Sequence, residues 1–219
     1  MIKYRFSYAK YGDAKYVSHL DLIRLFSRSF KRAQIPLTYS EGFNPHPKLA
    51  IGLPLSVGVT SECELMDAET DRELSAKDFD ELNRCLPMGL HINGAAERVP
   101  GMKKLSDIRW AEYRVTVYGE PVSAESIETF MNRDAVIIEK KTKRKTEETD
   151  ILPDVTSLTL VDSSEDSMLL SMVLSAGPEA NLKPDLVIAA MEKYIDVFVP
   201  TDYDLHRSSI LSASGLSLL

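Results

Sequence analysis

Residues 18–58 constrain the fold more than any other stretch of the chain, and they read SHLDLIRLFSRSFKRAQIPLTYSEGFNPHPKLAIGLPLSVG. Ser18 is placed to cap a helix, and Asp21 at the third helical position completes a pattern typical of a capping box. Apolar residues then recur at the spacing of one helix face. Pro45 and Pro47 exclude both a helix and a central strand from the loop that follows. The stretch therefore predicts a capped helix, a stiff loop and an apolar strand.

The pattern around this stretch predicts an α+β fold made of two tandem ferredoxin-like units of βαββαβ type with antiparallel sheets. The first unit is expected over 1–100, a linker over 101–109, and a second α+β ferredoxin-like unit with an extra hairpin over 110–219. The tail after Pro200 shows no clear period and receives no assignment. Strands are predicted at 3–9, 48–55, 62–69, 90–99, 110–118, 136–141, 154–161 and 168–176, helices from Ser18 and at 78–85, 123–132 and 183–198, and a solvated hairpin tip at KKTKRK, 140–145.

Charge is divided unevenly along the chain. The net charge of the 219 residues is −7, but residues 1–60 hold nine Lys or Arg against three Asp or Glu, a local charge of +6. A basic region on an acidic protein favours an anionic ligand, and RNA is the first candidate. Because no apolar run reaches about 18 residues, and the N-terminus lacks a signal-peptide core, we expect no membrane span and a cytoplasmic protein.

The basic side of the first helix is the first candidate site. Arg24, Arg28 and Arg32 stand four residues apart, so their guanidinium groups are expected to line about 12 Å of helix and to meet successive phosphates. The alternative is an ordinary solvent-facing side of an amphipathic helix. The full set proposed for RNA or anion binding is Arg24, Arg28, Lys31, Arg32, Phe43, His46 and Lys48.

The loop between Glu41 and Lys48 is the second candidate. Pro45 and Pro47 hold His46 in place, where an imidazole beside Lys48 suits phosphate binding or acid–base chemistry near neutral pH. Phe43 adds an aromatic face on which a base can stack. The alternatives are a rigid turn in which the histidine only bonds a backbone carbonyl, and a phenylalanine that plugs the core.

His19 provides a third, enzymatic hypothesis. At the first turn of a helix its imidazole is expected to be neutral, so His19 and His46 are the candidate acid–base pair of a metal-independent RNA endonuclease. The histidine spacing predicts no metal site, and no nucleotide-binding or hydrolase motif predicts a cofactor. The two cysteines, Cys63 and Cys85, are too few for the three thiolates of a C-x3-C-x2-C iron–sulfur motif.

The run from residue 18 to 58, followed by SECELMD, closely resembles the bacterial family of radical-SAM-linked proteins, a domain of unknown function. The segment EETDILPDV and the pair Lys183-Pro184 resemble later motifs of that family, whereas HRSSILSASG matches its Arg-containing ending only loosely. Members are free-standing or fused to cobalamin-type radical SAM proteins. The resemblance therefore implies a radical SAM enzyme as partner, and it favours RNA or ribosome metabolism.

Three functions follow from these observations. The first is a non-catalytic RNA-binding or substrate-presenting accessory protein that works with a radical SAM enzyme. The second is the endonuclease that uses His19 and His46, a reading strengthened only by the fold-level likeness of tandem ferredoxin-like domains to RNA endonucleases that process CRISPR transcripts. The third is a pure protein-docking module for a radical SAM enzyme. The residues alone do not specify the RNA, the oligomeric state or the role of the acidic second unit.

Overall fold

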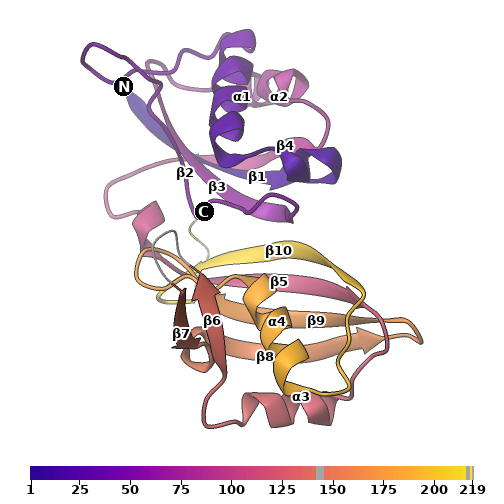
Figure 1. The fold of residues 1–219 in the computed structure, drawn as a ribbon. Coiled ribbons are helices and arrows are strands. Elements are labelled where there is room, and N and C mark those ends of the chain that lie inside the picture. Colours follow the sequence, from indigo (N-terminus) through magenta and orange to yellow (C-terminus); the bar gives the residue numbers. More distant parts are fainter. Residues whose placement is uncertain (142–145, 216–217, 219) are drawn as a thin grey trace. The chain divides into compact units, whose positions relative to one another are not determined.

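A computed structural model describes residues 1–141, 146–215 and 218, and these residues form two compact units. The first unit comprises Met1–Ile108 together with Leu218, and the second comprises Arg109–Gly215. Helices cover antiparallel strands in both (Figure 1). The predicted α+β class is therefore confirmed. Among the described residues, no helix has both the length and the apolar character needed to cross a bilayer.

The first unit is a four-stranded sheet with two helices on one face (Figure 1). Its strands lie in the order β4-β1-β3-β2, and β1 pairs antiparallel with both β3 and β4, as β2 does with β3. In chain order the elements are β1 (Ile2–Lys10), α1 (His19–Arg32), β2 (Leu49–Ile51), β3 (Thr60–Thr70), α2 (Ala76–Cys85) and β4 (Leu90–Glu97).

Helix α1 forms where the sequence predicts it. The Ser18 hydroxyl accepts a hydrogen bond from the backbone N–H of Asp21 and donates one to its carboxylate, so the first turn is capped. Phe26 and Phe30, both fully buried, extend from the helix into the core. The Phe30 ring meets the ring of Phe6 of β1 edge-on at 5.5 Å between centroids. This packing leaves the basic side of α1 in solvent.

The face of the sheet opposite the helices carries buried charge. Arg5 on β1 is completely buried, and its guanidinium makes two bonds to the Asp67 carboxylate of β3, at 2.7 and 3.0 Å. The same guanidinium donates to the backbone carbonyls of Lys103, at 2.7 Å, and of Leu218, at 3.1 Å. A buried arginine thus fastens two chain segments that are distant in sequence onto the sheet.

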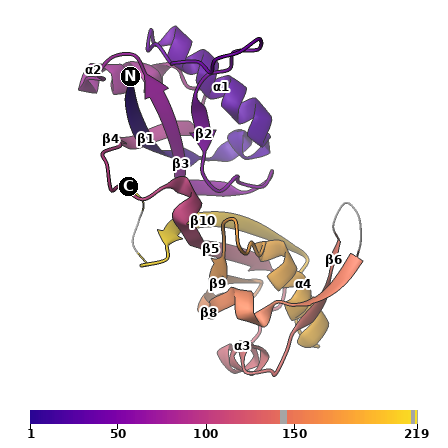
Figure 2. The same ribbon diagram turned by 90° about the vertical axis from the view of Figure 1, so that its left-hand side faces the viewer.

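The second unit is also a four-stranded sheet, with strand order β10-β5-β9-β8. The strands β6 and β7 pair with each other in a separate antiparallel hairpin that projects from the unit (Figure 2). Of the predicted hairpin tip, 140–145, the first two residues belong to β6, and 142–145 lie outside the described residues. The elements are β5 (Ile108–Tyr118), α3 (Ala124–Met131), β6 (Ile137–Lys141), β7 (Thr146–Asp150), β8 (Val155–Ser163), β9 (Ser167–Ser175), α4 (Pro184–Tyr194) and β10 (Asp202–Ser212).

Five parts of the chain differ from the prediction, and one of them is β7, because no strand was predicted over Thr146–Asp150. The strand expected over 48–55 is only Leu49–Ile51, because the chain bends at Gly52 and Pro54 cannot donate a hydrogen bond to a sheet. The helix expected to reach Phe198 ends at Tyr194. The expected linker 101–109 contains a short 3-10 helix, and β5 begins within it. The unassigned tail forms β10, the longest strand of the second unit together with β5.

Candidate functional site

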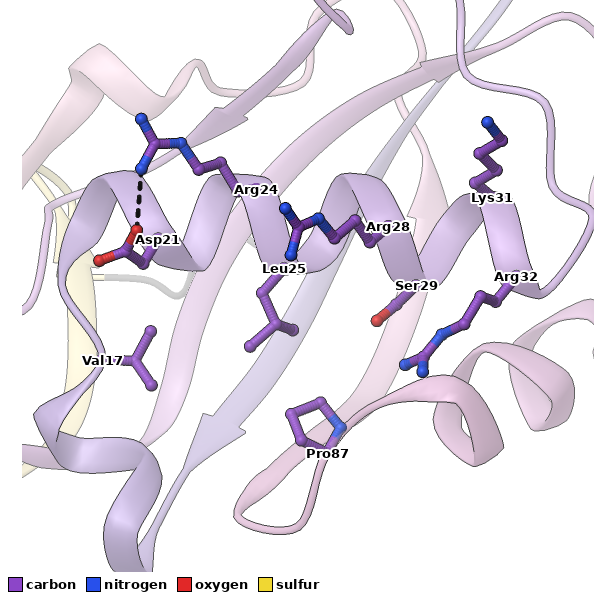
Figure 3. Close-up of a pocket in the computed structure, with 9 residues that line it drawn as sticks. All are labelled: Val17, Asp21, Arg24, Leu25, Arg28, Ser29, Lys31, Arg32 and Pro87. Carbon is purple, nitrogen blue, oxygen red and sulfur yellow. Dashed lines mark hydrogen bonds and ion pairs between the residues drawn. The ribbon is translucent and has the colours of Figure 1, made fainter.

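The basic side of α1 borders an open groove of about 830 Å³ (Figure 3). Its apolar part comes from Val17, just before the helix, Leu25 within it, and Pro87, which follows α2. Charged and polar side chains surround this apolar part. The lining is Val17, Asp21, Arg24, Leu25, Arg28, Ser29, Lys31, Arg32 and Pro87, so it contains four cations and one carboxylate.

Two of the four cations are available to a ligand. Arg28 and Lys31 are exposed, and neither makes a hydrogen bond or an ion pair with any residue that the structure describes. Figure 3 shows the Arg28 side chain extended along the helix above Leu25. A guanidinium with unused donors is well suited to a phosphate, since it offers two parallel N–H groups.

Arg24 is engaged within its own helix. Its Nη1 lies 3.0 Å from Oδ1 of Asp21, and the two side chains are 68% and 61% exposed. Hydrogen bonds from Ser18 and from Arg24 lower the pKa of Asp21, so the carboxylate is charged at neutral pH. Water screens exposed pairs of this kind, so they are weak and an incoming phosphate can displace Asp21 from Arg24 at small cost.

Arg32 has a structural contact. Its Nη2 donates to the backbone carbonyl of Cys85, the last residue of α2, and the Ser29 hydroxyl donates to the same carbonyl at 3.2 Å. A positive charge at the C-terminus of a helix is favourable because the backbone carbonyls there carry partial negative charge. The predicted row of three equivalent arginines is thus uneven. Arg24 and Arg32 have partners, whereas Arg28 and the neighbouring Lys31 have none among the described residues.

The structure does not place the seven predicted binding residues in one site. His46 and Lys48 line a second hollow of about 320 Å³, which shares no lining residue with the groove along α1. Phe43 lines neither of these hollows. The second hollow is formed by Lys3, His46, Pro47, Lys48, Leu49, Ala50, Asp67, Ala68, Glu69 and Arg98.

The loop that carries His46 is closed by its own hydrogen bonds. The Ser40 N–H donates to the His46 carbonyl at 2.9 Å, and the His46 N–H donates to the Ser40 hydroxyl at 3.1 Å. The imidazole Nδ1 lies 3.0 Å from the same hydroxyl and 3.4 Å from the Asn44 carbonyl. Gly42 turns the chain with a φ of +116°, which a side chain would strain. These bonds use Nδ1 and leave Nε2 for a ligand.

Lys48 is paired within the second hollow. Its Nζ lies 3.0 Å from Oε1 of Glu69, which also accepts a hydrogen bond from the Thr38 hydroxyl at 2.9 Å. The bond from Lys48 is the main reason that the pKa of Glu69 lies below its ordinary value. The charge of Lys48 is therefore largely committed to the sheet and is less available to an anion than the sequence suggests.

Phe43 is fully exposed at the tip of the loop, so the alternative that it plugs the core is wrong. Tyr39 at the base of the same loop is also half exposed. An aromatic ring without a packing partner on a loop closed by hydrogen bonds is available for stacking.

The two histidines of the endonuclease hypothesis have different surroundings. His19 occupies the first turn of α1, and its Nδ1 is buried without a hydrogen-bond partner among the described residues. The imidazole of His46 contacts Ser40 and Asn44. The polar contacts of the described residues therefore do not join the two rings, and their pairing stays a prediction.

Sequence reasoning missed Lys3 and Arg98 as neighbours of His46. Lys3 lies on β1 and Arg98 directly after β4, so only the pairing of these strands brings them to the loop. The one signal for them in the sequence is that both are basic residues at strand ends.

Lys10, by contrast, is buried, and its ammonium donates to the Val17 carbonyl at 3.0 Å. Neither Cys63 nor Cys85 forms a disulfide within the described part of the chain.

Comparison with solved structures finds a likeness of fold. A chain in the crystal structure of a Cbf5–Nop10–Gar1 complex is similar with a TM-score of 0.50 and 10% identity, over 94% of this chain and 49% of that one. A chain in the structure of an H/ACA RNP bound to a substrate RNA containing 2′-deoxyuridine is similar with a TM-score of 0.46 and 11% identity, over 94% and 47%. The protein thus spans about half the length of these chains.

Comparison with curated proteins finds no match. The family described as "Uncharacterized protein conserved in bacteria (DUF2344)" matches residues 3–184. This range includes both candidate surfaces and most of the second unit. The protein therefore belongs to this conserved bacterial family.

Proposed function

We propose that the protein is a non-catalytic RNA-binding accessory protein, and that the groove along α1 holds the phosphates of a single-stranded RNA. The observation that carries this proposal is the state of Arg28 and Lys31, which line an open groove and have no partner among the described residues. Arg24 adds a third cation at the cost of a weak surface pair.

The apolar part of the groove favours a single strand over a duplex. Single-stranded RNA binds where cations track the backbone and apolar or aromatic groups contact unstacked bases. Leu25 and Pro87 offer such a surface beside the cations. The exposed ring of Phe43 gives a further place for a base on the same unit.

We infer that both units are ferredoxin-like, as predicted. The order β4-β1-β3-β2 in the first unit is repeated as β10-β5-β9-β8 in the second, if the β6–β7 hairpin is treated as an insertion. The boundary at Ile108 supports two domains. The similarity to the Cbf5–Nop10–Gar1 chain supports the fold alone, because identity is 10%.

The proposal is tested by exchanging Arg24 and Arg28 for glutamate. We expect binding to a labelled single-stranded RNA to fall by at least tenfold, because two favourable charges become unfavourable. Each phosphate neutralised contributes about −0.7 to the slope of log K against log salt, so four cations predict a slope near −3 for the wild type, with a smaller one for the variant.

The matched control is Arg114→Glu with Lys183→Glu, two exposed residues of the second unit. This pair changes the net charge by the same amount but leaves the groove intact, and we expect unchanged affinity. Equal loss in both double variants would mean that total charge, not the groove, drives binding. Unchanged affinity in the Arg24/Arg28 variant would refute the proposal.

The same samples distinguish the endonuclease alternative. Intact RNA after incubation in chelator supports an accessory role. Cleavage that persists in chelator, leaves cyclic phosphate ends and is lost in His46→Ala would instead favour catalysis by His19 and His46.

The resemblance to radical-SAM-linked proteins supports a radical SAM enzyme as the partner that acts on the bound RNA, in the cytoplasm. With two cysteines this chain cannot supply the three thiolates of a C-x3-C-x2-C iron–sulfur motif, so the radical SAM chemistry would belong to the partner. Co-purification of the two proteins that survives nuclease treatment would show direct docking. Loss of the complex on nuclease treatment would show that RNA joins them.

A further inference from the structure

The second hollow contains hydrogen-bond donors that the fold does not use. Arg98 donates from Nη1 to Asp67 at 3.0 Å, yet its Nε–H is buried without a hydrogen-bond partner among the described residues. A buried guanidinium N–H without an acceptor costs free energy. Such a group in a native site usually indicates an acceptor that completes it.

Two more donors line the same hollow. Lys3 is exposed on β1, and no hydrogen bond or ion pair joins its ammonium to the described residues. His46 uses Nδ1 in the loop and has Nε2 unengaged in the described part of the chain. The three residues come from a strand, a loop and the segment after β4, and all of them line one hollow of about 320 Å³.

The carboxylates in the hollow already have partners. Asp67 accepts hydrogen bonds from Arg5 and from Arg98, and Glu69 accepts from Lys48 and Thr38. Both bonds to Glu69 end on its Oε1, and the charge of Lys3, opposite Glu69 in the β1–β3 ladder, also helps to lower the pKa of that carboxyl. The donors that remain are those of Lys3, Arg98 and His46, two of them on permanent cations. A compact acceptor with two negative charges and several oxygens matches this set better than a neutral or cationic ligand.

We propose that this hollow binds a phosphate monoester, with Lys3, Arg98 and His46 as its donors. The monoester dianion offers three terminal oxygens to three donors, and Pro47, Leu49 and Ala50 provide an apolar wall for a sugar. A mononucleotide and the phosphorylated end of an RNA chain share this chemistry. If the ligand is the phosphorylated end of an RNA chain, the site depends on the RNA binding proposed above. The protein then recognises RNA ends.

The test measures binding of inorganic phosphate and of uridine 5′-monophosphate by calorimetry at constant ionic strength. We expect wild-type protein to bind both and Lys3→Ala to bind at least fivefold more weakly. The matched control is Lys77→Ala, which removes the same charge from an exposed position on α2. Because Arg98 also holds Asp67, Arg98→Ala would change the stability of the fold as well as the site. The second informative variant is therefore His46→Gln, in the exposed loop.

The source of the phosphate is identified with two oligoribonucleotides of one sequence, carrying either a 5′-phosphate or a 5′-hydroxyl. Tighter binding of the phosphorylated one by wild type but not by Lys3→Ala assigns the hollow to RNA ends. Mononucleotide binding without this difference assigns it to a free nucleotide. If neither phosphate, nor the mononucleotide, nor the 5′-phosphate is bound through Lys3, the proposed site is wrong.

The experiments test the RNA-binding proposal for the groove and the phosphate-binding proposal for the second hollow separately. The Arg24→Glu/Arg28→Glu variant should lose affinity for both oligoribonucleotides and keep its affinity for uridine 5′-monophosphate. The Lys3→Ala variant should keep binding the 5′-hydroxyl RNA.

Discussion

Gln34 ends helix α1 in a left-handed conformation, with a φ of +56°. The Ile35 N–H donates to the Phe30 carbonyl at 3.0 Å, and the Gln34 N–H donates to the Lys31 carbonyl at 3.2 Å. These two bonds form the Schellman arrangement, in which glycine is preferred because it has no Cβ. This turn positions the last residues of the basic face. The left-handed backbone of Gln34 therefore lies next to the groove.

We expect Gln34→Gly to raise the free energy of unfolding by up to about 1 kcal/mol, because relief of the left-handed strain exceeds the entropy that glycine adds to the unfolded chain. Gln34→Ala is the control, since alanine retains the strain. Urea denaturation of the three proteins provides the measurement. Equal stability of the glycine and alanine variants would contradict the assignment of strain to this turn.

Phe43 is a large apolar residue that is fully exposed, so its side chain does not contribute to the packing of the fold. If its ring stacks on a base, Phe43→Ala should weaken RNA binding by about 1–3 kcal/mol, and Phe43→Trp should preserve the affinity. Because the side chain is fully exposed, the free energy of unfolding should change by less than about 0.5 kcal/mol. Fluorescence anisotropy and thermal unfolding of the same samples measure the two effects. Unchanged RNA affinity in Phe43→Ala would remove this residue from the site.

At the scale of elements, α2 begins with a strongly bonded cap. The Asp78 carboxylate accepts from the Ser75 N–H at 2.8 Å and from Arg72 at 2.6 Å. These contacts, the Arg72 bond first, hold the pKa of Asp78 far below its ordinary value. The cap matters to the groove because the C-terminus of α2 supplies the Cys85 carbonyl that holds Arg32.

This cap predicts a dependence of stability on pH. The folded-state pKa of Asp78 is lowered, so its contribution is fully present above the unfolded value of about 3.9 and is lost as the pH falls below it. We expect Asp78→Asn to lower the free energy of unfolding by about 1–2 kcal/mol at pH 7. The difference from wild type should shrink as the pH approaches 2.

Asp80→Asn is the control for this prediction, because Asp80 is an exposed carboxylate on the same helix. It should leave the stability nearly unchanged at both pH values. A difference between wild type and Asp78→Asn that stays constant with pH would show that the carboxylate charge does not stabilise the cap.

At the scale of the whole molecule, Arg5 connects the first strand with the segment that leaves the first unit and with Leu218 near the C-terminus. Its charge is buried and depends on Asp67. Arg5→Leu leaves this carboxylate with fewer partners, so we expect a loss of about 3–5 kcal/mol in the free energy of unfolding. Lys3→Ala on the same strand should cost less than about 0.5 kcal/mol. Similar losses in the two variants, measured by urea denaturation, would contradict the role of Arg5.

Local signals in the sequence were sufficient for α1. Its cap, its buried stripe and its basic side follow from residues within a few positions of one another, and the structure confirms all three. The strand β10 carried no such signal. Its alternation is mixed, and Leu205, Arg207 and Ile210 are buried in the folded unit, where β10 pairs with β5.

The sequence by itself determined the α+β class, the basic helix and the stiff loop of His46, because these depend on capping, periodicity and proline. Only the tertiary structure decided which charges remain free. Strand pairing commits Lys48 to Glu69 and packing of α2 commits Arg32. Within the described part of the chain, no hydrogen bond or ion pair engages Arg28, Lys31, Lys3 or the Nε–H of Arg98. The physical reason is that an ion pair or a buried donor depends on distances between residues far apart in the chain, which no local pattern encodes.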